Sequence, residues 1–337
     1  MRQWLYTYDL FNVYFATAAN QFGFKSGIGC THAVFCVKNV INSYVMHGNT
    51  ANILALDIAK AFPRVNHFAL LSKLIARKAP LCLVNLLESW LTRSRSKVRW
   101  CGVVSGDFSL RVGVNQGSVL APALFGVFIN DVLVTCNAKH IGAVFVYADD
   151  ILIVTKSLST VQCLFDIVQL ELAKCNMNLN VSKCCAMRVG PRFDAGCANI
   201  TTVSGLAIVW VKEIRYLGAF LVAGRVLRFS VACAKAKFNR AVNSILSKVA
   251  SVATEDLILH LIKVKCMPIL LYSLEVCDLN KSTLAALDFC VMRFGFRIFR
   301  TGNRDVVREC FDYFNFSLPS VLIASRYSRF LSKLALW

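Results

Sequence analysis

Acidic residues are scarce in this chain of 337 residues, which has 19 Asp and Glu against 38 Lys and Arg. Because of this deficit, the charges do not balance, and the formal net charge is +19. Such an excess of positive charge is typical of proteins that bind a polyanion. Nucleic acid is the first candidate, and an anionic membrane surface is the second.

Long uninterrupted hydrophobic runs are missing, although 56% of the residues are apolar and the mean hydropathy is +0.55. The most apolar windows, Val119–Val134 and Ile141–Val154, both contain acids, and both are shorter than the roughly 18 residues that a membrane-spanning helix needs. We therefore predict no membrane partner. The N-terminus also lacks the charged, apolar and small-residue order of a signal peptide. We expect an intracellular protein, nuclear or cytoplasmic, that is not secreted.

Metal-binding cysteine patterns are missing as well. The 15 cysteines include no C-x-x-C pair, and the adjacent Cys184 and Cys185 have no histidine near them in the sequence. An odd number of cysteines in a large chain without a signal peptide does not indicate a disulfide framework. We expect the cysteines to be small buried hydrophobic residues, and we predict no structural zinc.

A pair of adjacent acids stands at the centre of the most apolar part of the chain. In the segment Ile141–Lys156, two runs of mostly β-branched and aromatic residues flank Asp149 and Asp150. This pattern predicts two buried strands with the acids at the tip of the hairpin. Two adjacent carboxylates repel each other unless a cation neutralises them, so both are candidate metal ligands. The alternative is an exposed acidic turn on a core hairpin.

A third acid, Asp57, ends the predicted strand Asn52–Asp57, directly before a helical pattern. An Asp between a strand and a helix also serves as a helix N-cap, and this alternative stays open. Together with Asp149 and Asp150, however, it completes the set of carboxylates that holds two divalent ions for in-line phosphoryl transfer. In such a site one ion activates the attacking hydroxyl, and the other stabilises the leaving pyrophosphate.

Three loop regions add candidate nucleotide contacts. The glycine-rich segment Gln21–Ala33 carries Lys25, a cation suited to a phosphate, although plain turn chemistry explains the same pattern. Phe62 is either a core residue or a wall of the pocket near a sugar. Gln116 and Gly117 precede a long apolar helix, at a position where an amide can contact a sugar or a base edge.

Four blocks of this sequence resemble the finger and palm motifs of reverse transcriptases, in their order and at about their spacing. The second to fourth blocks read K-A-F-x-x-V-N-H, G-V-x-Q-G-S-V-L-x-P and Y-A-D-D, and they are similar to the enzymes of non-LTR (LINE-type) retrotransposons. The resemblance covers roughly Leu10 to Leu221. The four blocks are Gln21–Gly27, Leu56–His67, Gly113–Pro122 and Tyr147–Asp150.

The resemblance implies an α+β fold of the right-hand polymerase class. Partial fingers would occupy residues 1–50, and the palm, with an antiparallel sheet, flanking helices and residual finger elements, would occupy 51–223. An α-helical thumb and a C-terminal tail would occupy 224–337. Because the upstream finger motifs of the family are missing, we expect an N-terminally truncated fragment.

The resemblance also assigns catalytic roles. Asp57 and Asp149 would bind two Mg²⁺ ions, with Mn²⁺ as an alternative, and Asp150 would be the third carboxylate of the family. Lys183, in the segment N-L-N-V-S-K-C, matches a position that approaches the triphosphate and protonates the pyrophosphate. A surface lysine without a role is the alternative at that position.

Further roles concern the nucleotide and the primer. Phe62 matches the gate that excludes a 2′-hydroxyl, and Gln116 matches the residue that contacts the incoming deoxynucleotide, with Gly117 beside it. The turn of Tyr216, Leu217 and Gly218 resembles the primer grip.

Beyond Gly224, helical patterns over Ser230–Val252, Glu255–Val276 and Lys281–Phe299 predict the thumb. Basic residues recur at helical spacing in this region, which places several cations on one face that could follow a duplex backbone. A merely solvated basic face is the alternative. These residues are Lys235, Lys237, Arg240, Arg293, Arg297 and Arg300.

Two classes of function therefore remain. In the first, the chain is an RNA-directed DNA polymerase that binds an RNA template, a DNA primer and deoxynucleoside triphosphates, and extends the 3′-hydroxyl of the primer. In the second, it is a catalytically inert nucleic-acid-binding remnant of such an enzyme. The sequence does not determine the oligomeric state.

Overall fold

The computed structural model describes residues 13–249 and 253–335, which form two compact units. The first unit comprises the described part of Met1–Lys212 together with Gly224–Val226, and the second comprises that of Glu213–Ala223 and Leu227–Trp337. The predicted fingers (1–50) and the predicted helix Ser230–Val252 include residues 1–12 and 250–252, which lie outside the described residues.

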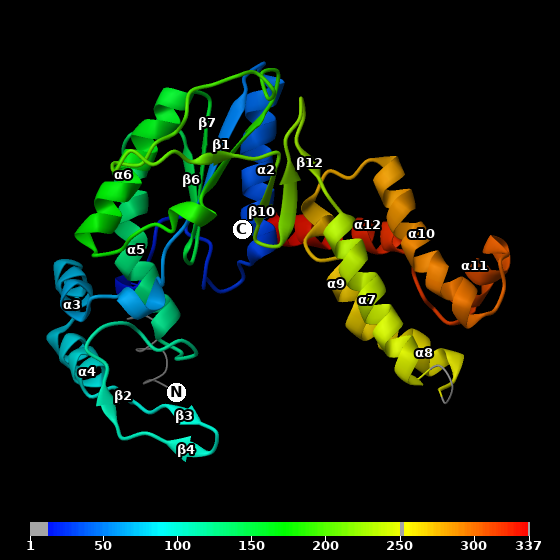
Figure 1. The fold of residues 1–337 in the computed structure, drawn as a ribbon, viewed down its shortest axis with the longest axis horizontal. Helices are drawn as coiled ribbons and strands as arrows, with labels where there is room; N and C mark the ends of the chain where they lie inside the picture. The colour runs from blue at the N-terminus through cyan, green and yellow to red at the C-terminus, as the bar shows by residue number, and fades with distance from the viewer. Residues whose placement is uncertain (1–12, 250–252, 336–337) are drawn as a thin grey trace. The chain divides into compact units, whose positions relative to one another are not determined.

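The first unit is built on a five-stranded sheet (Figure 1). Neighbouring strands are antiparallel, except for the parallel pair β8 and β9. The central strands are made largely of Ile, Leu, Val and Ala, which suit a sheet that is covered on both faces. The order across the sheet is β6 (Ala143–Tyr147), β7 (Asp150–Thr155), β1 (Ala51–Asp57), β8 (Cys185–Val189) and β9 (Val209–Trp210).

Helices cover both faces of this sheet. Figure 1 shows α5 (Ala121–Asn137) and α6 (Leu158–Lys174) on one side and α2 (Cys30–Met46) on the other. Because successive strand residues point to opposite faces, alternate residues of β7, such as Ile151 and Ile153, join the core against α5 and α6. Two further helices, α3 (His67–Ala76) and α4 (Leu81–Thr92), extend this core.

Short paired strands lie between α4 and α5. β3 (Arg99–Trp100) pairs with β4 (Val103–Val104) through a two-residue turn, Cys101 and Gly102, in which both residues have positive φ. β2 (Arg95–Ser96) pairs with β5 (Phe108–Ser109) further from the tip.

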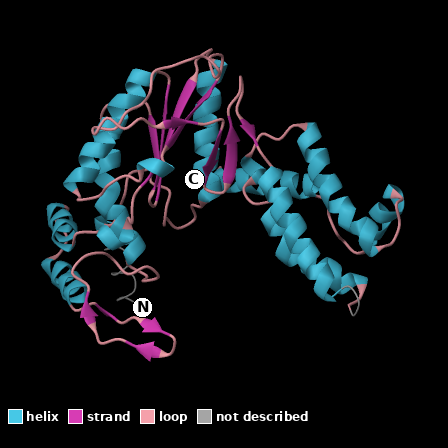
Figure 2. Ribbon diagram, viewed as in Figure 1, coloured by secondary structure: helices cyan, strands magenta, loops and turns pink. Residues whose placement is uncertain are grey.

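The second unit begins with a small antiparallel sheet and continues as helices (Figure 2). Its core is rich in phenylalanine, with the ring centroids of Phe294 and Phe311 separated by 5.6 Å. The elements are β10 (Glu213–Tyr216), β11 (Ala219–Val222), β12 (Arg228–Phe229), α7 (Ala232–Val249), α8 (Glu255–Leu261), α9 (Met267–Leu270), α10 (Lys281–Ile298), α11 (Arg304–Tyr313) and α12 (Pro319–Leu334).

The segment predicted as one helix, Glu255–Val276, is broken. A π-helical turn at Ile262–Cys266 separates α8 from α9, and a 3₁₀ turn at Leu274–Val276 follows. Pro268 lies just after the π turn, where it has no N–H to offer to a preceding carbonyl. Hydrophobic periodicity alone does not predict this break.

The cysteines are buried, half-buried or exposed, so their prediction as buried hydrophobic residues is right only in part. All are free; Cys136 and Cys266 are buried, whereas Cys82 and Cys163 are exposed. Burial raises the pKa of Cys136 to about 12, so its thiol stays protonated at neutral pH. None of the described helices is long and apolar enough to cross a membrane.

Helix α10 has a side-chain cap that can be tested by substitution. The Oδ1 atom of Asn280 accepts a hydrogen bond of 2.8 Å from the backbone N–H of Thr283. Replacing Asn280 by Ala is expected to lower the free energy of unfolding by about 1 kcal/mol, since an N-cap acceptor is lost. Urea denaturation followed by circular dichroism measures the change. Ser282→Ala, at an exposed position of the same turn, is the control and should leave stability nearly unchanged.

Candidate active site

The acid pair lies at the tip of the hairpin formed by β6 and β7, as predicted. Tyr147 ends β6 and is the register partner of Asp150, the first residue of β7, so the turn between them consists of Ala148 and Asp149. Ala148 has a φ of 56°, the positive value that tight hairpin turns require at this position. This conformation is unusual for a residue with a Cβ, so the turn is held by its surroundings.

Asp57, far away in the sequence, lies directly opposite this tip. In the antiparallel pairing of β1 with β7, Asp57 is the partner of Asp150, and the buried pair Leu56 and Ile151 precedes it. Directly opposed residues in a sheet have Cβ atoms about 4.5–5.5 Å apart and point to the same face. The sheet register therefore brings the two predicted acids together, with Asp149 in the adjoining turn.

Lys183 joins the same end of the sheet. The backbone N–H of Asn180 donates to the carbonyl of Asp57 at 2.8 Å, which places the 3₁₀ turn Val181–Lys183 beside β1. From this turn the Nζ atom of Lys183 reaches the Oδ2 atom of Asp57 at 3.5 Å. Because 65% of the lysine side chain is exposed, this ion pair adds little stability.

The three carboxylates suit a hard divalent cation in their chemistry and in their positions on the sheet. All are oxygen donors of the kind that Mg²⁺ prefers, and they come from two neighbouring strand ends and one turn. The Lys183 ammonium already lies beside one of them. Among the described residues, no three His, Cys, Asp or Glu side chains are gathered closely enough to hold a metal ion.

Phe62 lies in the 3₁₀ turn Phe62–Arg64 that follows β1. Its ring is stacked on that of Phe125 in α5, with the centroids 4.7 Å apart. On another side, the ring of Phe24 approaches edge-on at 6.2 Å. The Phe62 ring is thus both packed on the core and half-exposed, which agrees with either of its two predicted roles.

The loop that carries Gln116 and Gly117 begins beside this turn. The backbone N–H of Val114 donates to the carbonyl of Phe62 at 3.0 Å, and that of Gly113 donates to Val65 at 2.8 Å. Gln116 and Gly117 follow and are exposed. The backbone thus brings this predicted nucleotide loop to Phe62.

Lys25 is held by backbone carbonyl groups. Its Nζ atom donates to the carbonyls of Ala18 at 2.7 Å and Thr17 at 3.4 Å, and burial lowers the pKa of its ammonium group. Contact with a phosphate would require it to leave both carbonyls.

The segment Asn20–Gly23 overlaps the first block that resembles reverse transcriptases, Gln21–Gly27, and it supports the acid hairpin. Phe22 donates its N–H to the carbonyl of Val146 at 2.8 Å, and Val146 donates to Asn20 at 3.0 Å. A Cβ atom at Gly23 would lie 2.5 Å from the backbone nitrogen of Ala148. The only sequence signal for this close approach is Gly23 itself.

The predicted primer-grip residues lie in the second unit, at the turn between β10 and β11. Leu217 and Gly218 form this turn with φ values of 46° and 86°, a pattern typical of a type I′ hairpin. Tyr216 is buried. A Cβ atom at Gly218 would lie 2.6 Å from the ring of Tyr272, so the turn packs closely on the helical part of its own unit.

Basic side chains from two helices of the second unit converge. Lys235 of α7 and Arg293 of α10 both lie near the Cys290 thiol and act to lower its pKa, although burial raises that pKa more. The Nη1 atom of Arg297 donates to Asn243 of α7 at 2.6 Å. The two helices therefore share one basic surface.

Known proteins resemble this chain over most of the first unit. The family model described as reverse transcriptase (RNA-dependent DNA polymerase) matches residues 7–221. The RNA-directed DNA polymerase from mobile element jockey of Drosophila funebris is 30% identical over 211 residues, which are 60% of this chain and 23% of the relative. The Pol polyprotein of the R2DM retrotransposable element of Drosophila melanogaster is 26% identical over 227 residues, which are 61% of this chain and 21% of the relative. The chain thus spans less than a quarter of either relative.

Solved structures resemble the fold at low sequence identity. Apo telomerase from Candida tropicalis has a TM-score of 0.52 and 13% identity, over 91% of this chain and 55% of that one. Telomerase from Candida albicans, in a complex with a fragment of telomeric RNA, has a TM-score of 0.50 and 13% identity, over 94% of this chain and 55% of that one. These similarities confirm the predicted α+β polymerase fold. The chain belongs to the reverse transcriptase (RNA-dependent DNA polymerase) family and is distantly related to the enzymes of the non-LTR retrotransposons jockey and R2.

Proposed function

We propose that this chain is the polymerase part of a non-LTR retrotransposon protein. It adds deoxynucleotides from deoxynucleoside triphosphates to the 3′-hydroxyl of a DNA primer on an RNA template. The observation that carries this proposal is the register of the central sheet, which sets Asp57 opposite Asp150 with Asp149 in the adjoining turn.

The three acids would hold two Mg²⁺ ions, with Mn²⁺ as the alternative. When bound, such ions lower the pKa of the attacking hydroxyl and neutralise charge on the triphosphate. Asp57 and Asp150 at the strand ends and Asp149 in the turn would hold these ions, because ionised carboxylates are oxygen ligands for hard cations. Lys183, whose ammonium lies 3.5 Å from Asp57, supplies a proton to the departing pyrophosphate.

Residues around Phe62 select deoxynucleotides over ribonucleotides. Its ring is fixed by stacking on Phe125, and a fixed ring can reject a 2′-hydroxyl by steric exclusion. Gln116 and Gly117 contact the incoming deoxynucleotide from the neighbouring loop. Lys25 meets a phosphate after releasing its two carbonyl partners.

The remaining assignments concern the nucleic acid. Tyr216, Leu217 and Gly218 form the primer grip, and the shared basic surface of α7 and α10 contacts the phosphates of the template–primer duplex. The division into partial fingers (1–50), palm (51–223) and thumb (224–337) is part of the same proposal.

Primer extension on poly(rA)/oligo(dT) tests the proposal. With Mg²⁺ and dTTP, the purified chain is expected to extend the primer, and EDTA is expected to stop extension. Fluorescence anisotropy at several salt concentrations measures the binding of the same protein to the duplex. Background incorporation together with retained, salt-sensitive binding would contradict the proposal and select the inert nucleic-acid-binding remnant.

A further inference from the structure

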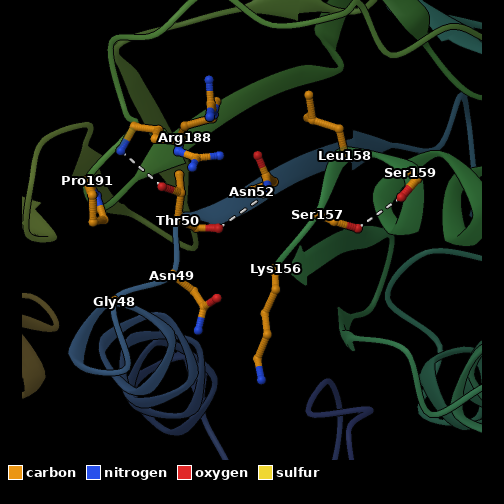
Figure 3. A pocket seen from close by; sticks show the side chains of 11 residues that line it. Gly48, Asn49, Thr50, Asn52, Lys156, Ser157, Leu158, Ser159, Arg188 and Pro191 are labelled. Atoms are coloured by element: carbon orange, nitrogen blue, oxygen red, sulfur yellow. Dashed lines mark hydrogen bonds between the residues drawn. The ribbon is translucent and has the colours of Figure 1, made fainter.

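A pocket lies at the opposite end of the five-stranded sheet from the acids (Figure 3). Its volume is about 530 Å³, which is within the range of small-molecule sites. Asn52, near the start of β1, lines it, whereas Asp57 ends the same strand. Five residues of extended strand separate them, about 17 Å. The pocket is therefore distinct from the candidate active site.

The pocket is lined by cations. Lys156 follows β7, Arg188 lies in β8, and Arg192 follows β8. None of the described residues that line the pocket is acidic. Three positive charges without a matching acid favour an anionic ligand.

The pocket also receives the N-terminus of a long helix. Ser157 is the N-cap of α6, and its Oγ atom accepts from the N–H of Thr160 at 3.2 Å. Leu158 and Ser159, the first helical residues, line the pocket. The first N–H groups of a helix have no partner within the helix and carry a partial positive charge, which is an arrangement that binds phosphate.

Two buried polar atoms in the pocket are without a partner among the described residues. The side chain of Asn52 is almost fully buried, at 3% exposure, and its Oδ1 atom accepts no hydrogen bond. The Nε atom of Arg188, its cross-strand partner, donates none. Figure 3 shows Asn52 between the Arg188 side and the Ser157 side of the pocket. Leaving such atoms unpaired is costly, so they point to a ligand that offers both an acceptor and a donor.

We propose that this pocket binds a phosphate monoester of nucleotide size. The phosphate oxygens face Arg188, Arg192 and the N-terminus of α6, and a ligand hydroxyl donates to Asn52. Lys156 joins them when its ammonium leaves the ring of Tyr44, whose centroid lies 5.2 Å away. The apolar surfaces of Leu158 and Pro191 are left for the sugar or the base. The ligand is either a free nucleotide or the 5′-phosphorylated end of a strand. This proposal does not rest on polymerase activity.

Calorimetric titration of the full chain with dTMP in EDTA tests the pocket, since chelation removes metal-dependent binding at the acids. We expect dTMP to bind more tightly than both inorganic phosphate and thymidine. The double variant Lys156→Gln/Arg192→Gln, at two exposed positions, is expected to bind dTMP at least about tenfold more weakly, because two charged contacts are lost. Its thermal melt should match that of the wild type.

A matched control separates this site from other basic surfaces. Arg99→Gln removes a cation from the exposed β3–β4 hairpin and should leave dTMP affinity unchanged. Wild-type affinity in the double variant, or equal binding of dTMP and inorganic phosphate, would overturn the proposal. A preference for a 5′-phosphorylated over a 5′-hydroxyl oligonucleotide identifies a strand end as the ligand, and equal binding of the two identifies the free nucleotide.

Discussion

Replacing Asp149 by Asn is expected to reduce primer extension by about 1000-fold or more. The amide keeps the size of the side chain and removes its negative charge, so the turn between β6 and β7 should keep its shape. Metal ions stabilise several kcal/mol of transition-state charge when their ligands are intact. A loss of about 4 kcal/mol corresponds to about 1000-fold in rate. Single-turnover extension on poly(rA)/oligo(dT) measures the change.

The specificity of this effect depends on two comparisons. Asp107→Asn removes an acid from an exposed ion pair with Lys97, at 3.1 Å in the β4–β5 region, and should leave extension unchanged. Duplex affinity of Asp149→Asn should stay near that of the wild type, since the substitution touches no basic surface. Extension at wild-type rate in Asp149→Asn would exclude this acid from catalysis and weaken the whole assignment.

The local part of the active site could be predicted from sequence. β-branched residues on both sides of Asp149 and Asp150 are sufficient to predict a hairpin with acids at its tip, and Asp57 at the end of an apolar run predicts a strand end. What the pattern could not provide is the register, since pairing β1 with β7 joins segments about 90 residues apart. The resemblance to reverse transcriptases supplied that connection.

Two further features could not be predicted, because they also depend on contacts between separate segments of the chain. The partners of Lys25 are backbone carbonyls, which leave no mark in the sequence. The phosphate pocket joins Asn52, Lys156 and Arg188, each of which alone resembles an ordinary surface or strand residue. Only the order of the sheet and the cap of α6 bring them together.

Gly23→Ala is expected to reduce primer extension by about 100-fold while the chain stays folded. The added Cβ would lie 2.5 Å from the backbone nitrogen of Ala148, and backbone cannot yield as a flexible side chain can. The turn that carries Asp149 must therefore shift, or the segment Asn20–Gly23 must leave β6. Displacement of catalytic groups by about 1 Å can cost about 100-fold in rate. Extension kinetics and a thermal melt measure the two consequences separately.

Gly29→Ala provides the matched control for this steric argument. Gly29 lies in the same glycine-rich segment, has an extended φ of −129°, and a Cβ there would meet no heavy atom within 4 Å. Gly29 is also the N-cap of α2, where alanine is less favourable than glycine, so its substitution should lower the melting temperature slightly and leave extension nearly unchanged. If Gly23→Ala also behaved as the wild type, the close packing of Gly23 on the turn would have no catalytic consequence. If it lost activity while keeping its melting temperature and its duplex affinity, the segment Asn20–Gly23 would be a positioning element of the acid turn.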